Sequence, residues 1–167
     1  IYAAGFSCLL IRLSFFDVQF AAAGLFACWA LLIIGLADLK YMIIPDQFVI
    51  MLAISAFGFI PYQSGLMQPL LGALVGGGVM LMVGVLGGAA FKKEVLGFGD
   101  VKLFACLGLA LGLTGTVVVL IGASLLSGIG AAIAMASGRA KKDDAKPLGP
   151  YICGMGIFYI FIVWPFL

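Results

Sequence analysis

The sequence predicts an all-α fold, a polytopic bundle of about six to seven transmembrane helices joined by short loops. Hydrophobic residues make up 65% of the 167 residues and charged residues 10%, against roughly 25% charged residues in soluble domains. The mean hydropathy is +1.28. A soluble domain of this length could not keep so much apolar surface away from water. We therefore expect residues 1–167 to form a single membrane-embedded domain.

Apolar segments give the expected helices in order. A helix needs about 20 residues to cross a bilayer, and the second, fourth, sixth and seventh segments meet or approach that length. The first begins at the start of the chain, and the third and fifth are short. Strands are not favoured, because alternating runs of about ten residues are absent. The segments are residues 2–16, 20–37, 47–60, 66–91, 101–111, 114–137 and 150–167.

Glycines four residues apart recur in these segments. This spacing lets helix backbones approach closely in lipid. It therefore predicts tight helix packing, and it also permits self-association into a homo-oligomer. The pairs are Gly72 and Gly76, Gly84 and Gly88, and Gly108 and Gly112.

The charged residues gather in alternate connections between the segments. Eight of the nine basic residues fall in three connections, and Arg12 is the exception. Alternate connections share one side of a membrane, and short basic loops stay in the cytoplasm. We expect these three loops to be cytoplasmic and the C-terminus to be outside. The groups are Asp38, Lys40 and Asp46; Lys92, Lys93, Glu94, Asp100 and Lys102; and Arg139, Lys141, Lys142, Asp143, Asp144 and Lys146.

The composition excludes several classes of function. The chain has no histidine, which excludes a Ser-His-Asp triad, a Cys-His pair and an H-E-x-x-H zinc site. The low charge excludes a nucleic-acid binder. None of the four cysteines lies in a C-x-x-C pair, so we interpret them as small buried hydrophobic residues. We expect no metal and no cofactor. The cysteines are Cys8, Cys28, Cys106 and Cys153.

Two aspartates are candidate catalytic residues because of their position. Asp38 follows the apolar run 21–37, and Asp100 precedes another apolar run. Each is expected at the cytoplasmic membrane surface, where a carboxylate is costly unless it is paired or hydrated. The alternative for each is an interfacial cap or anchor, and Asp100 could be the N-cap of a helix that starts at Val101.

A pair of carboxylates can hydrolyse a peptide bond without a cofactor. One carboxylate, ionised, takes a proton from water, while the other, protonated, polarises the scissile carbonyl. Close carboxylates cannot both ionise cheaply, so the pair shares a proton. This chemistry needs neither histidine nor metal, which agrees with the composition.

Residues near the two aspartates are candidates for shaping the loops or binding substrate. Gly97 and Gly99 permit unusual backbone angles and close approach of a substrate strand, and a plain flexible loop is the alternative. Pro45 disfavours helix at Ile44, so the preceding helix is expected to end before that residue. Asp46 is then expected to cap the next helix.

Two lysines complete this set of candidate residues. Lys40 and Lys102 each follow a candidate aspartate by two residues. Each lysine could tune the carboxylate, and binding of a lipid phosphate is the alternative.

Three motifs resemble those of the type IV prepilin peptidases. Residues 38–46 (DLKYMIIPD) resemble the first aspartate motif of that family, and residues 97–103 (GFGDVKL) look like its G-x-G-D motif. Residues 148–150 (LGP) are similar to its F-G-P element, with Leu in place of Phe. The three motifs occur in the order found in the family.

The resemblance implies an aspartic endopeptidase of the bacterial inner membrane. Asp38 and Asp100 would be its catalytic pair, and Gly97 and Gly99 would shape the loop around Asp100. The implied substrates are prepilins or pseudopilins, which serve type IV pili or type II secretion. Their leader would be cut at the cytoplasmic membrane face. Membrane lipids are the other expected partners.

Two departures from the family pattern concern methylation. Many relatives carry an N-terminal domain with paired C-x-x-C motifs and also methylate the new N-terminus, and this chain has no such pairs. Either the chain is a peptidase-only type or that domain lies outside the sequence. Many relatives have a second aspartate where this chain has Lys40. We therefore do not assign N-methyltransferase activity to this chain.

Three other functions are left open. A presenilin-like protease also has G-x-G-D, but those relatives carry Tyr-Asp and P-A-L where this chain has Ala37-Asp38 and residues 147–149 (PLG). A small transporter could use two carboxylates as an ion site, although the uncharged outer loops argue against that reading. The third alternative is a structural subunit of a secretion apparatus.

Overall fold

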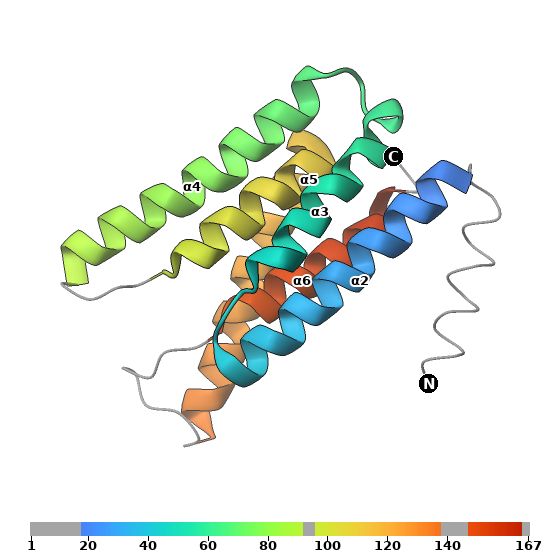
Figure 1. Cartoon of the computed structure of the whole chain (residues 1–167). Coiled ribbons are helices and arrows are strands. Elements are labelled where there is room, and N and C mark those ends of the chain that lie inside the picture. Colours follow the sequence, from blue (N-terminus) through green and yellow to red (C-terminus); the bar gives the residue numbers. More distant parts are fainter. Residues whose placement is uncertain (1–17, 92–95, 138–146, 165–167) are drawn as a thin grey trace.

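A computed structural model describes residues 18–91, 96–137 and 147–164, and these ranges are helical (Figure 1). The expected all-α class is confirmed for them. The elements in order are α2 (Val18–Tyr41), α3 (Asp46–Phe59), the 3-10 turn η1 (Ile60–Tyr62), α4 (Met67–Phe91), α5 (Phe98–Ala136), α6 (Gly149–Phe158) and the π-helical turn η2 (Tyr159–Val163).

Three of the described helices are long and apolar enough to cross a membrane, namely Val18–Tyr41, Met67–Ala89 and Phe98–Ala136. Asp46–Tyr62 and Gly149–Val163 are shorter apolar helices. The count of six to seven spans stays a prediction. The expected segment 2–16 with Cys8 and Arg12, the charges Lys92, Lys93 and Glu94, and the charged group 139–146 lie outside the described residues.

The chain reverses direction inside α5, at Gly112. This glycine has φ 69° and ψ −177°, which interrupts the helix. In a straight helix Phe104 and Thr116 would lie about 18 Å apart. Both residues nevertheless lie beside Gly76 of α4. A Cβ on Gly76 would lie 2.7 Å from the Phe104 carbonyl oxygen and 3.0 Å from Thr116 Cγ2. The break lies between the expected segments 101–111 and 114–137.

Polar side chains bond the carbonyl groups near this break. Gln63 Nε2 donates to the carbonyl oxygens of Leu109, at 3.4 Å, and Ala110, at 3.0 Å. The Thr116 hydroxyl donates to the Gly112 carbonyl at 2.6 Å. A buried carbonyl without a partner is costly, so these bonds stabilise the reversal.

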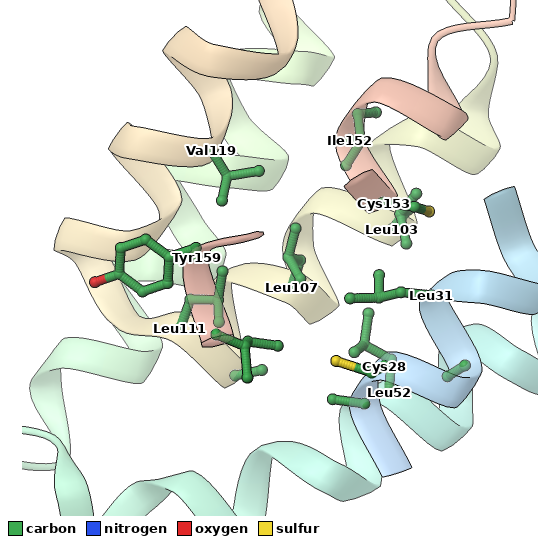
Figure 2. Close-up of a cluster of buried hydrophobic side chains, with 14 of the residues drawn as sticks. Cys28, Leu31, Leu52, Leu103, Leu107, Leu111, Val119, Ile152, Cys153 and Tyr159 are labelled. Carbon is green, nitrogen blue, oxygen red and sulfur yellow. The ribbon is translucent and has the colours of Figure 1, made fainter. Parts of the chain in front are cut away.

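The core lies where α2, α3, α5 and α6 meet, and α4 packs chiefly on α5. Figure 2 shows apolar side chains from these four helices pointing toward one another. Burying one such side chain stabilises the fold by about 1.5–3 kcal/mol in water, whereas inside lipid close packing is the main gain. The fully buried members include Leu31, Leu52, Leu103, Leu107 and Ile152.

The cysteines in the described ranges are free thiols. Cys28 and Cys153 are buried, and Cys106 is half-buried. Their interpretation as small buried hydrophobic residues is thus confirmed for the first two, which lie in the core (Figure 2).

Candidate functional site

Asp38 is buried in the last turn of α2, with 6% of its surface exposed. The backbone N–H of Gly149, the first residue of α6, donates a hydrogen bond to Asp38 Oδ2 at 3.0 Å. The carbonyl end of its own helix disfavours a carboxylate there, whereas the N–H groups that begin a helix favour one. The start of α6 therefore supplies the donor that the end of α2 lacks.

Asp100 is half-buried in the first turn of α5. The Gly97 backbone lies close to its carboxylate, since a Cβ on Gly97 would lie 3.7 Å from Asp100 Oδ2. Asp100 Oδ1 is buried and has no hydrogen-bond partner among the described residues. The helix begins at Phe98 with Gly97 as its N-cap, so the alternative that Asp100 caps a helix starting at Val101 is wrong.

The two aspartates come together at one end of the bundle. Their carboxylates are close enough to interact electrostatically, and both also interact with the buried Cys153 of α6. Three helices therefore meet at this pair, with one aspartate from α2, one from α5, and α6 against them. General acid–base chemistry requires two carboxyl groups within reach of each other, and this arrangement supplies them.

The connection between α2 and α3 packs against the start of α5. The helix of Asp38 ends at Tyr41, before Ile44, as Pro45 predicts. A Cβ on Gly99 would lie 3.1 Å from Ile44 Cβ. Gly99 thus permits the close approach of Ile44, and the expected approach of a substrate strand stays a prediction.

Asp46 does not cap α3. Pro45 holds the N-cap position without a side-chain hydrogen bond, and Asp46 is the first helical residue. Its carboxylate pairs instead with Lys102, whose Nζ lies 3.1 Å from Oδ1 and 3.2 Å from Oδ2. The predicted cap is wrong because the N-cap position falls on Pro45, one residue earlier than expected.

Lys40 and Lys102 contact aromatic rings and not the two candidate catalytic aspartates. Lys40 Nζ lies 5.1 Å from the centre of the Tyr41 ring, and Lys102 Nζ lies 5.7 Å from that of Phe98. Within the described ranges, neither lysine forms an ion pair with Asp38 or Asp100.

The site includes residues that the sequence analysis did not single out. Gly149 lies inside the motif 148–150, which was the available signal for it. Gly35 carried no signal, and Cys153 was expected only as a small buried hydrophobic residue. A Cβ on Gly35 would lie 3.3 Å from Cys153 Cβ. This contact sets how closely α2 and α6 approach beside Asp38. Among the described residues, no three His, Cys, Asp or Glu side chains gather as a metal-ligand set.

Comparison with known proteins identifies the family. A model of the type IV leader peptidase family matches residues 25–133, which include both Asp38 and Asp100. This chain belongs to that family. The residues matched by the family model end before Gly149, so the contact between α6 and Asp38 is an observation of the structure alone.

Similar curated proteins are named prepilin leader peptidase/N-methyltransferase. The protein of Pectobacterium carotovorum subsp. carotovorum is 34% identical over 162 residues, covering 84% of this chain and 56% of that protein. The protein of Xanthomonas campestris pv. campestris is 32% identical over 151 residues, covering 86% and 51%. The protein of Bacillus subtilis is 30% identical over 136 residues, covering 76% and 50%.

The chain spans about half the length of the curated relatives that it matches. No solved structure matches it.

Proposed function

We propose that this chain is a membrane aspartic endopeptidase that removes the leader of type IV prepilins or pseudopilins at the cytoplasmic membrane face. Asp38 and Asp100 are its catalytic residues, and the reaction uses no cofactor. The observation that supports this most is the meeting of the two aspartates, from α2 and α5, within reach of each other's charge. Family membership supports the reaction and the substrate class.

The proposed reaction needs one ionised and one protonated carboxyl group. The ionised group takes a proton from water, the water oxygen bonds to the scissile carbonyl carbon, and the protonated group gives its proton to the carbonyl oxygen. The first group then passes its proton to the amide nitrogen, and the C–N bond breaks. The second group recovers a proton from a hydroxyl of the intermediate. The products are a carboxylic acid and an amine, and both aspartates return to their starting state.

Burial makes the pair suitable for this chemistry. Fixed groups in a site of low dielectric interact more strongly with developing charge than they would in water. Asp38 is held by a backbone N–H, whereas the buried Asp100 Oδ1 has no hydrogen-bond partner among the described residues, so its bonding capacity is unused in this structure.

Apolar side chains near the site suit a membrane-embedded substrate. Met42 and Ile43, which follow α2, are 58% and 63% exposed, and Phe98, the first residue of α5, is 66% exposed. A prepilin joins a basic leader to an apolar helix. We infer that the apolar helix approaches sideways through lipid near the Asp100 loop, while the leader stays at the cytoplasmic surface.

The proposed orientation follows from the charges. The ends of α2 and α4 and the starts of α3, α5 and α6 adjoin the three basic connections of the sequence. Short basic loops stay in the cytoplasm, so the aspartate end of the bundle faces the cytoplasm of a bacterial inner membrane.

The proposal covers peptide-bond hydrolysis alone. The word N-methyltransferase belongs to the names of relatives of which this chain covers about half. If the chain is incubated with cleaved pilin and a labelled methyl donor, we expect no methyl transfer.

One assay tests the proposed function. The purified chain in detergent or lipid is incubated with a prepilin, and the products are identified by mass spectrometry. We expect cleavage between leader and body, resistance to metal chelators, and no cleavage by the Asp38→Asn chain. If the folded chain leaves prepilins and pseudopilins intact, the proposal is wrong.

A further inference from the structure

We propose that Gly149 is a positioning residue of the reaction, which holds the Asp38 carboxylate through its backbone N–H and through its lack of a side chain. The catalytic part of this inference rests on the proposed function. The contact itself joins residues 111 positions apart and does not depend on that function.

Space, and not backbone conformation, requires glycine at position 149. The residue begins α6 and has no left-handed φ, so alanine could adopt its backbone and is favoured over glycine in a helix. A Cβ there would lie 2.6 Å from Asp38 Oδ2, 2.9 Å from Cγ and 3.2 Å from Cβ. Carbon atoms in contact lie about 3.5–4.0 Å apart, so one of the two residues would have to move.

The start of α6 leaves this N–H for Asp38. Tyr151 and Ile152 donate their N–H groups to the Leu148 carbonyl, at 3.1 and 3.2 Å. Pro150 has no N–H and suits the first turn of a helix. Gly149 is therefore the residue of this turn whose N–H reaches the carboxylate.

The neighbouring packing limits how Asp38 could adapt. Asp38 is buried, and one turn away Gly35 of α2 lies against Cys153 of α6. A larger residue at position 149 must then either tilt α6 or push the carboxylate out of its place beside Asp100. A displacement of about 1 Å can cost about a hundredfold in rate.

The matched test compares two glycines of α6. Gly149→Ala should lower kcat for prepilin cleavage about a hundredfold, with KM for the prepilin within about threefold of wild type, because the substrate-facing loops are unchanged. Gly154→Ala is the control, since Gly154 is exposed and a Cβ there meets nothing within 4 Å. It should keep wild-type kcat. A Gly149→Ala enzyme with wild-type kcat would overturn the inference.

A second measurement tests the contact without activity. Gly149→Ala should lower the Tm of the purified chain by about 4 °C or more. In an Asp38→Ala chain the colliding carboxyl atoms are gone, so the same substitution should have less than half that effect. Equal Tm losses in both backgrounds would overturn the inference. If the wild-type chain cleaves no prepilin, the proposed function fails. The comparison of the two Tm losses then decides alone whether Gly149 holds Asp38.

Discussion

Lys102 Nζ lies 3.1 Å from Asp46 Oδ1, so an ion pair joins α5, two residues beyond Asp100, to the first turn of α3. The two side chains are 44% and 65% exposed. An exposed pair of this kind contributes about 0–1 kcal/mol to stability and is screened by salt.

Asp46→Asn should therefore leave substantial cleavage activity, within about fivefold of wild type. The reason is that the pair is solvent-exposed and touches neither catalytic carboxylate. Initial rates of prepilin cleavage at low and high salt measure the effect, with Lys102→Gln as the matched variant. A loss as large as that of Asp100→Asn would place Asp46 in the catalytic machinery and contradict this prediction.

The error at Asp46 shows where sequence reasoning stops. Capping rules use neighbours along the chain, and they identified the end of α2 before Ile44 correctly. They could not find Lys102, which lies 56 residues away. The hydrogen bond from Gly149 to Asp38 has the same character. By contrast, apolar runs that end at Asp38 and begin after Asp100 are local, so both aspartates could be found as candidates from the sequence.

The glycine pairs show the same limit for packing. Their spacing predicted close helix contacts but not the partners. Within the chain, the backbones of Gly72 on α4 and Gly108 on α5 lie against each other, and Gly76 lies against Phe104. These faces are therefore used inside the chain, and the homo-oligomer stays a prediction.

Gly72→Ala should destabilise the packing of α4 on α5 by about 1–3 kcal/mol. A Cβ there would meet the carbonyl oxygen of Gly108 and lie 2.7 Å from the Gly112 carbonyl carbon. Backbone atoms cannot rotate away, so the helices must separate. Thermal unfolding in detergent measures the loss. Gly78→Ala on the same helix, where a Cβ meets nothing within 4 Å, should leave Tm unchanged, and equal effects of both substitutions would contradict the prediction.

Gly112→Ala should also destabilise the chain, by about 1–3 kcal/mol. At φ 69° and ψ −177° a side chain is strained, and its Cβ would lie 2.7 Å from Gln63 Oε1. The control is Gly128→Ala, in the second half of α5, where a Cβ meets nothing within 4 Å. Denaturation midpoints compare the two. If Gly112→Ala matches the control, the reversal of α5 does not depend on this glycine.

The orientation of the bundle can be tested by cysteine labelling in cells. In a chain without its four native cysteines, Lys142→Cys and Lys40→Cys should react with a membrane-impermeant reagent only after the membrane is opened. Ser64→Cys, on the connection between η1 and α4 at the opposite end, should react from outside. Labelling of Lys142→Cys in intact cells would show that the charged connections face outward.

The catalytic pair itself gives the last prediction. Asp38→Asn and Asp100→Asn should each lower prepilin cleavage by at least about a thousandfold, because Asn keeps the size of the side chain but can neither take nor give the proton. Each variant should still insert in the membrane and keep a Tm near that of wild type. The double variant should be no worse than either single one, since residues that act as a unit are not additive. Two independent roles would instead give losses that multiply. Near-normal cleavage by either single variant would show that the two aspartates are not a catalytic pair, even though their charges interact.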